Sequence, residues 1–538
     1  MTKYNTVPSK KFLWKPLQKN QAKQFYLGAT VSLVGLSLCF FPFYRGFAAT
    51  EPSIRLIKPP HKQSNQFTID DPSLLRMTQM QERFIKASTN LISVNDAIKL
   101  AITNNPSLQI AKSAIDSQYY DLLAARRQWI PTLAFANTLP TLGSYNSKSF
   151  VKYKNEPLGG VPQDYQINSK YYTFAPEIQA SWTFLSVPRA GAIKSNFYGL
   201  KSEQYLYSVS LRNLILSVQQ AYYQVQSAKK LIDSFNQIYL INKRQLEILD
   251  ARYSKKLIDL GSLSQTKAQY YQQLSQLISA YNQYFSACAQ LSNVIGEKNY
   301  QDFVPADDLK ATGTWDKDLS QTIQEAIMLR EEIKSNLAMA NSYKWTASAL
   351  YGTYYPTFTL SALGTLTIDN GNISQPSYVQ STNNYDYSLS TVSSTIGLGF
   401  TWSLFDGGVN AASAKSYQAQ AKQQLLTSIQ NEELVASQVK SAFYLYQTSI
   451  ESVKVTKQAL DAANQAQKVA NIRFQIGFGD ITTVVQTIQL YGQAYTAYIS
   501  ALLDYNTAVA QLYRYSAVYP ESIGQTAEAV INQAFDNH

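Results

Sequence analysis

The sequence predicts an α+β membrane protein with an internal two-fold repeat, in which long helices are continuous with the strands of a β-barrel. Motifs recur about 220 residues apart, so that Trp182 and Phe184 align with Trp402 and Leu404. Each half also holds two segments in which apolar and polar residues alternate, as they do in strands. Each half further holds long stretches almost free of Gly and Pro, which favour helix.

Residues 1–48 are predicted to be a cleaved signal peptide. They contain seven Lys and Arg and no acidic residue, and these cations flank an apolar run at 26–44. The small residues Gly46 and Ala48 suit cleavage after Ala48. An uncleaved membrane anchor is the alternative, because the apolar run approaches the roughly 20 residues that span a bilayer.

Composition argues against a nucleic-acid partner and against an enzyme. The formal net charge is +11, and removing the seven positive charges of residues 1–48 leaves about +4. The mature chain would hold one thiol, Cys288, and its two histidines, His61 and His538, lie near the two ends of the chain. We therefore expect no metal site, no cofactor and no catalytic site.

The first repeat is predicted to cover residues 89–300, after a Pro-containing extension at 49–88. A helix capped by Ser93 should run to Pro131, because proline cannot continue a helix. Two strands are expected at about 132–142 and 172–185, joined by a polar loop at about 143–170. A helical hairpin should follow, with its tip at about 253–263.

The second repeat is predicted to cover residues 318–517, after a linker at 301–317 and before a C-terminal tail at 518–538. Its strands are expected at about 356–368 and 391–405, with a polar loop at about 369–389. Its helical hairpin should have its tip at about 474–482. The first helix of each hairpin could extend on the order of 90 Å at 1.5 Å per residue.

Four strands cannot close a barrel by themselves. An open sheet in lipid would leave unpaired backbone groups, each of which costs several kcal/mol. Several chains must therefore pool their strands, and three chains would give a twelve-stranded wall around a three-fold axis. The same axis would gather the helices into a tube.

Three motifs resemble those of the TolC family of outer-membrane efflux proteins, over roughly residues 90–517. They are the opening Asn105-Pro106-Ser107-Leu108 segment, the strand-to-helix junction Phe400-Thr401-Trp402-Ser403-Leu404-Phe405-Asp406-Gly407-Gly408, and the tip segment Arg473-Phe474-Gln475-Ile476-Gly477. The resemblance implies a homotrimer whose twelve-stranded outer-membrane β-barrel, with four strands per protomer, continues into a long α-helical periplasmic barrel. It also implies passive export of drugs, small molecules or proteins, with a periplasmic adaptor, an inner-membrane pump or ABC transporter and outer-membrane lipid as partners.

The resemblance also assigns roles to the hairpin tips. It places adaptor docking at Leu257, Ile476, Gly477, Phe478 and Gly479, although Gly is also expected in an ordinary helix–helix turn. Candidates for a periplasmic aperture come from both tips: Arg252, Tyr253, Asp259, Ser262, Arg473, Phe474, Asp480, Thr483 and Gln486.

The positions that match the family's acidic ring and locking arginine do not hold those residues here. A shifted acidic ring of Asp259 and Asp480 is one interpretation, and solvated tip charges are the other. At the strand-to-helix junction we expect a structural role for Trp182, Trp402, Asp406, Gly407 and Gly408, because glycines permit the sharp turn and Asp406 can cap the helix.

Two other functions remain open from the sequence. One is an envelope-spanning coiled-coil structural protein anchored by the apolar run at 26–44. The other is an outer-membrane adhesin that binds through the loops at 143–170 and 369–389.

Overall fold

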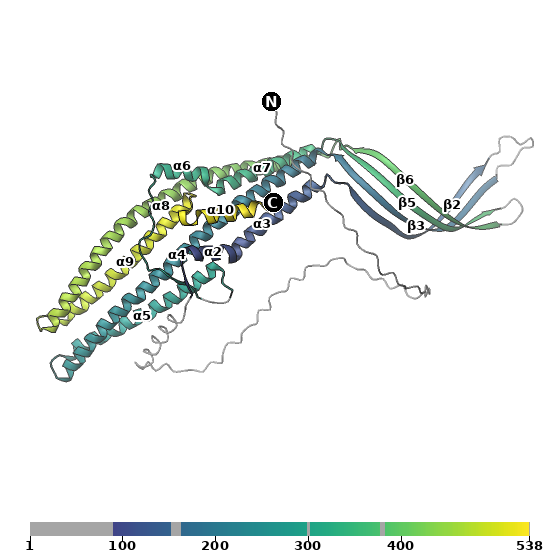
Figure 1. Ribbon diagram of the computed structural model, residues 1–538. Coiled ribbons are helices and arrows are strands. Elements are labelled where there is room, and N and C mark those ends of the chain that lie inside the picture. Colours follow the sequence, from purple (N-terminus) through teal and green to yellow (C-terminus); the bar gives the residue numbers. More distant parts are fainter. Residues whose placement is uncertain (1–89, 152–162, 299–301, 377–381, 537–538) are drawn as a thin grey trace, which may run out of the picture. The chain divides into compact units, whose positions relative to one another are not determined.

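The computed structural model describes residues 90–151, 163–298, 302–376 and 382–536 (Figure 1). The predicted signal peptide at 1–48 and the predicted extension at 49–88 lie outside the described residues. Among the helices that are described, none is both long enough and apolar enough to cross a membrane.

The described chain contains the same series of elements twice: a broken helix, a pair of strands and a long helical hairpin. The first series is α2 (Val94–Asn104), α3 (Pro106–Arg127), β2 (Thr132–Val151), β3 (Gln163–Leu185), α4 (Val187–Ser254) and α5 (Leu260–Ile295). The second series is α6 (Leu319–Leu329), α7 (Glu331–Gly352), β5 (Thr357–Pro376), β6 (Thr382–Thr401), α8 (Val409–Gln475) and α9 (Ile481–Tyr515).

The opening helix of each repeat is broken in two, whereas the sequence predicted one continuous helix. In the first repeat, Pro106 has no N–H and forces the preceding Asn105 into an extended conformation. The Asn105 side chain then caps α3 by accepting hydrogen bonds from Ser107 N at 2.8 Å and Leu108 N at 3.3 Å. In the second repeat, Arg330 interrupts the helix at the same place with φ −57° and ψ 122°, without a proline.

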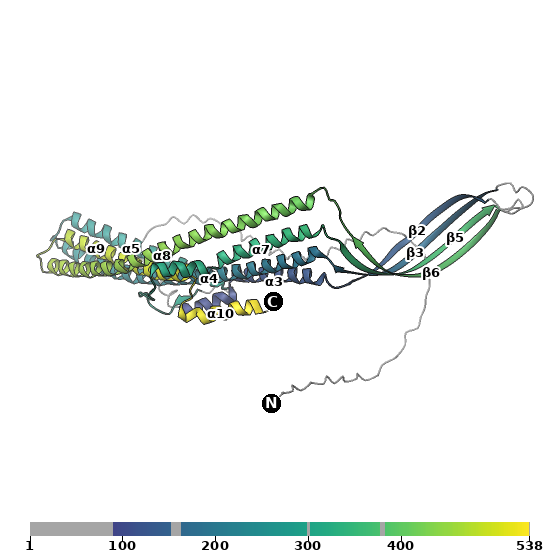
Figure 2. The ribbon, with the colours of Figure 1, turned by 90° about the horizontal axis from the view of Figure 1, so that it is seen from above.

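The four long strands form one antiparallel sheet in the order β2-β3-β5-β6 (Figure 2). β2 and β3 pair as far as Val151 and Gln163, and β5 and β6 pair as far as Pro376 and Thr382. The predicted loops at 143–170 and 369–389 were therefore too long. Backbone pairing continues after the apolar alternation ends, and the alternation was the only visible sign of a strand. The predicted end of the last strand at 405 is also wrong, because β6 ends at Thr401.

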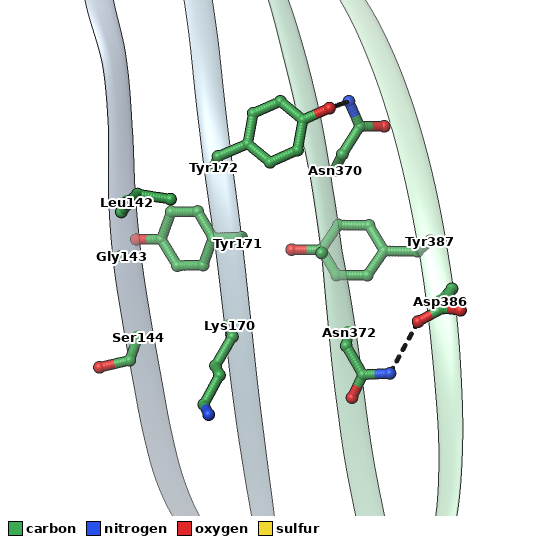
Figure 3. A pocket seen from close by; sticks show the side chains of 11 residues that line it. Leu142, Gly143, Ser144, Lys170, Tyr171, Tyr172, Asn370, Asn372, Asp386 and Tyr387 are labelled. Carbon is green, nitrogen blue, oxygen red and sulfur yellow. Dashed lines mark hydrogen bonds between the residues drawn. The ribbon is translucent and has the colours of Figure 1, made fainter. Parts of the chain in front are cut away.

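Tyrosine rings cover glycines in both halves of this sheet (Figure 3). A Cβ at Gly143 would lie 2.6 Å from the ring of Tyr171, on the paired strand. A Cβ at Gly371 would lie 2.8 Å from the ring of Tyr387, in the second repeat. Each ring therefore occupies the space that a side chain at the glycine would need, which compensates for the packing that a glycine lacks in a strand.

The helices of the first repeat enclose the largest hydrophobic cluster. Its large fully buried side chains include Tyr222 of α4 and Tyr281 and Tyr284 of α5. Tyr222 Oη donates a hydrogen bond to Ile92 O at 3.1 Å, which ties α4 to β1 (Leu91–Ile92). β1 in turn pairs in parallel with β4 (Val304–Pro305) of the predicted linker.

The predicted C-terminal tail contains a further helix, α10 (Glu521–Asp536). Its buried residues Ile523, Ala527 and Ala534 join the hydrophobic cluster of the first repeat. The tail therefore packs onto α2 and α4, far from it in the sequence.

A buried charged cluster joins the repeats near the break between α6 and α7. Glu332 accepts from Arg330 Nε at 2.9 Å and from Arg514 Nη2 at 2.6 Å. Burial alone would raise the pKa of Glu332, but the two guanidinium groups lower it to about 2. Arg514 Nε also donates to Asn213 Oδ1 at 2.7 Å, so the cluster connects α9 with α4.

Candidate functional site

The two hairpin tips have the same backbone geometry. In the first tip, Lys256 N donates to Tyr253 O at 2.8 Å and Leu257 N donates to Arg252 O at 3.0 Å. In the second, Gly477 N donates to Phe474 O at 3.2 Å and Phe478 N donates to Arg473 O at 2.9 Å. Both patterns are Schellman motifs, in which the residue after the helix is left-handed.

The residue in the left-handed position differs between the tips. Gly477 has φ +85°, which glycine adopts without steric cost. Lys256 has φ +59° at the equivalent position, so the first tip holds a strained non-glycine residue. Gly479 is needed for a different reason, since the backbone leaves no room for a side chain at this position. A Cβ there would lie 2.8 Å from Phe474 N.

Each tip exposes apolar side chains beyond the ends of its helices. Phe478 is 86% exposed and Leu257 is 69% exposed. Leu260 and Ile476 are also mostly exposed, so both tips present the same kind of surface. Isolated exposed apolar residues are common on protein surfaces, whereas apolar groups gathered at protruding tips favour a contact with another protein.

Asp259 and Asp480 cap the returning helices. Asp259 Oδ1 accepts from Ser262 N at 2.9 Å, and its Oδ2 accepts from Ser262 Oγ at 2.7 Å. These bonds, first of all that from the Ser262 hydroxyl, lower the pKa of Asp259. Asp480 Oδ2 accepts from Thr482 N at 3.2 Å. Within the described residues, no Lys or Arg lies within ion-pair distance of either carboxylate, so the countercharges considered from the sequence are not in contact with them.

Two contacts hold the hairpins of one chain together near their tips. The guanidinium carbon of Arg252 lies 4.8 Å from the ring centroid of Phe474, which is a cation–π contact between α4 and α8. Phe474 is buried in a cluster with Leu249, Leu263 and Ile481, which come from both hairpins. Thr483 and Gln486 remain exposed on α9.

The second contact joins α5 and α9 and was not predicted. Gln489 Nε2 donates to Gln269 Oε1 at 2.9 Å. The two glutamines are not counterparts in the repeats, because the offset of 221 residues that relates Asp259 to Asp480 aligns Gln269 with Leu490.

The strand-to-helix junctions are fixed by indole hydrogen bonds that recur in both repeats. Trp182 Nε1 donates to Trp129 O, and Trp402 Nε1 donates to Tyr354 O, both at 2.9 Å. Each indole therefore ties the end of its strand segment to the end of the preceding helix.

Asp406, Gly407 and Gly408 form the cap of α8. Asp406 accepts from Gly408 N and Asn410 N, both at 2.9 Å, and from the Tyr354 hydroxyl at 2.9 Å. Gly407 and Gly408 have φ of +72° and +81°, which the sharp turn requires. The hydrogen bonds, above all that from Asn410 N, lower the pKa of Asp406.

Neither tip nor junction holds a cluster suited to a metal ion. Throughout the part of the chain that the structure describes, no group of three or more His, Cys, Asp or Glu is placed to bind one.

Comparison with known proteins identifies the fold. The model of the outer membrane efflux protein family matches residues 97–297 and 322–518, which are the two repeats. The solved structure of the Campylobacter jejuni CmeC outer membrane channel matches with a TM-score of 0.64 at 14% identity, over 81% of this chain and 89% of that chain. No curated protein sequence matches significantly.

Two further channels show the same fold. The outer membrane protein VceC of Vibrio cholerae matches with a TM-score of 0.58 at 17% identity, over 79% of this chain and 96% of that chain. The open state of the Neisseria gonorrhoeae MtrE outer membrane channel matches with a TM-score of 0.59 at 14% identity, over 79% of this chain and 89% of that chain. The fold is thus that of bacterial outer membrane channels. The chain belongs to the outer membrane efflux protein family, and the predicted family and fold class are confirmed.

Replacing Gly479 with Ala should loosen the second tip. The new Cβ would collide with the backbone of Phe474, and relief of that clash should open the last turn of α8 at a cost of about 1–3 kcal/mol. We expect trypsin to cleave after the exposed Arg473 several-fold faster than in the unaltered protein. Gly364→Ala is the matched control, because a Cβ at Gly364 meets nothing within 4 Å. Equal cleavage of both variants would contradict the proposed clash.

Proposed function

We propose that three copies of this chain form the outer-membrane exit duct of a tripartite efflux pump, of a type I secretion system or of both, passively conducting drugs, small molecules or proteins. The observation that carries the proposal is one face of the sheet, whose apolar rows cross all four strands. Membership of the outer membrane efflux protein family supports the outer-membrane location. Export by a cleaved signal peptide at 1–48 is part of the proposal.

Directly paired residues lie on the same face of a sheet, so the register defines each row. Leu360 pairs with Trp182 and Leu398, and Ile368 pairs with Phe174 and Ser390. Large exposed apolar residues dominate this face, with the small polar Ser390 and Ser394 among them: Leu133, Phe135, Ile178, Val392, Ile396, Leu398 and Phe400. The opposite face carries polar residues such as Thr359, Ser361, Thr365, Thr391, Ser393 and Thr395.

The height of the apolar face matches a bilayer. Its rows run from Phe358 to Ile368, about ten residues, which at about 3.3 Å per residue and a tilt of about 40° give a band about 25 Å tall. The next rows on the same face are polar: Asn370 Nδ2 donates to the Tyr172 hydroxyl at 2.8 Å, and Asn372 Nδ2 donates to Asp386 Oδ1 at 2.7 Å (Figure 3). The hydrocarbon boundary therefore falls between Ile368 and Asn372.

The edges of the sheet require neighbouring chains. β2 and β6 each pair on one side only within the described chain. Unpaired backbone groups in lipid cost several kcal/mol each, so an edge at this depth must pair with another strand. Pairing β6 of one chain with β2 of the next, three times, gives the closed twelve-stranded barrel.

The exposed apolar tips support docking of a periplasmic adaptor, through which an inner-membrane pump or ABC transporter would supply cargo and energy. Leu257, Ile476 and Phe478 would enter the interface, while Gly477 and Gly479 shape the turn that presents them. The aperture would lie beside this surface, where Arg252, Tyr253, Arg473 and the two aspartates surround the tips.

Conductance tests the proposed duct. We expect purified mature protein, reconstituted in a planar bilayer, to form discrete channels, and its cross-linked mass on the same sample to be that of three chains. A monomer or dimer that never conducts would contradict the duct and favour the envelope-spanning structural protein.

Charges at both tips should abolish export without closing the channel. Leu257→Glu with Phe478→Glu places two charges on exposed surface, so the fold and the bilayer conductance should not change. Cells that carry this variant as their sole copy should accumulate a fluorescent efflux substrate several-fold, because charged tips cannot enter an apolar interface. Leu257→Met with Phe478→Met is the matched control and should retain export. Normal export by the charged variant would place docking elsewhere.

Removing the tip carboxylates tests the aperture. Asn also caps helices well, so Asp259→Asn with Asp480→Asn should keep both tips folded while removing two negative charges per chain. We expect multivalent cations added from the tip side to block the reconstituted channel less strongly. Glu451→Gln with Asp461→Asn, on the exposed side of α8, is the control and should leave the block unchanged. Equal block in both variants would mean that the cation site is elsewhere.

A further inference from the structure

Two tyrosines lie in one row of the sheet, on the face opposite the apolar face. Gly143, Tyr171, Gly371 and Tyr387 are directly paired in this order across β2, β3, β5 and β6. Directly paired residues share a face, and successive residues of a strand alternate between the two faces. Tyr172 belongs to the face with the apolar rows, so the Gly–Tyr row lies on the side that is turned away from lipid in the proposed duct.

Each ring of this row lies along the sheet and does not stand up from it. The Tyr171 Cζ atom would be 2.6 Å from a Cβ at Gly143, and the Tyr387 Cε1 atom would be 2.8 Å from a Cβ at Gly371. Figure 3 looks onto the sheet and shows both rings almost face-on, each extending over the neighbouring strand. One face of each ring therefore covers the backbone at a glycine, and the other face is turned away from the sheet.

The faces that are turned away from the sheet are available to a ligand. Both tyrosines are half-buried, as expected for a ring with one covered face. None of the ring pairs and cation–π contacts between described residues involves Tyr171 or Tyr387. The face of an aromatic ring is electron-rich, so it attracts cations and stacks with other flat groups.

A carboxylate lies one row away from the rings on the same face. Asp369 pairs with Thr173 and accepts a hydrogen bond from its Oγ1 at 2.5 Å, which holds the carboxylate against β3, the strand of Tyr171. Gly371, which the ring of Tyr387 covers, is two residues further along β5, about 7 Å at 3.3 Å per residue. The negative charge is therefore within reach of a ligand that rests on either ring.

No positive charge balances this carboxylate. Glu177 lies further along β3 on the same face, and none of the described strand residues of this face is Lys or Arg. Lys170 lies on the opposite face, and within the described residues neither Glu177 nor Asp369 forms an ion pair. Three chains would place two carboxylates and two ring faces each on the wall of the barrel, where charges of one sign attract ions of the other.

We propose that this wall binds organic cations with a flat aromatic body, with the body against the free faces of Tyr171 and Tyr387 and the positive charge beside Asp369. The inference rests on the proposed function, because this face lines a lumen only where three chains close a barrel. Each ring contributes a factor of about two to five in affinity. Such weak sites would hold a cation briefly and release it, as passage through a duct requires.

Block of the reconstituted channel by dyes tests the site. Crystal violet, a triarylmethane cation, is added from the side opposite the tips and compared with a sulfonated triarylmethane anion of similar size. The cation should halve the current at a concentration about tenfold lower than the anion, because only the cation is attracted by Asp369 and by the ring faces. Equal block by the two dyes in a normally conducting channel would overturn this inference and leave the duct standing. Failure to form any channel would overturn the duct, and the binding site with it.

Variants locate the binding. Tyr171→Leu with Tyr387→Leu removes both rings and should raise the half-blocking concentration of the dye cation about tenfold. Tyr171→Phe with Tyr387→Phe keeps both rings and should leave that concentration within about twofold. Asp369→Asn retains an acceptor for Thr173 Oγ1 and should raise it several-fold. Tyr172→Leu, on the opposite face of β3, is the matched control and should leave it unchanged.

The leucine pair also uncovers two glycines, so the unitary conductance of each variant is measured first. Where the leucine pair forms no channels, Asp369→Asn decides the question, because it removes a charge and keeps the rings in place. A half-blocking concentration that does not change in Asp369→Asn would place the bound cation elsewhere in the channel and overturn the inference.

Discussion

The constraint on which the rest of the structure depends is the need to satisfy backbone hydrogen bonds at the edges of a four-stranded sheet. β2 and β6 each leave one side unpaired within the described chain, yet the face between them is apolar over the thickness of a bilayer. In the proposed duct these edges lie in lipid, where water cannot solvate them, so they would pair with the edges of other copies. Because α4 and α8 follow the strands almost directly, a shared barrel also brings the helices of neighbouring copies together.

The two repeats reach the same backbone geometry with different residues. At the hairpin tips, Gly477 adopts the left-handed conformation freely, whereas Lys256 adopts it under strain. At the strand-to-helix junctions, Asp406 caps α8 in the second repeat. In the first repeat, the guanidinium group of Arg189 donates to Thr183 O at 2.6 Å and stacks on Trp129 instead. The shared geometry therefore survives changes in sequence, because each repeat supplies its own hydrogen-bond partners.

The repeats meet along β3 and β5 and where α4 packs against α7 and α9, and a few polar contacts between them are chemically specific. Arg252 stacks on Phe474 and Gln489 bonds to Gln269 near the tips, while Arg514 joins Glu332 and Asn213 near the middle of the chain. The last of these is a buried network, in which the loss of one partner leaves a charge uncompensated.

The sequence by itself determined the type and order of the main elements, because the period of apolar residues follows burial along each element. It also determined the tips, since a cap such as Asp259 or a glycine such as Gly477 acts within a few residues of its own position. Only the tertiary structure decided the break at Arg330, the strand pairing beyond the apolar band, the packing of α10 and the partners of Phe474 and Arg514. These features depend on groups that lie far apart in the chain, and a local pattern contains no information about which of them meet.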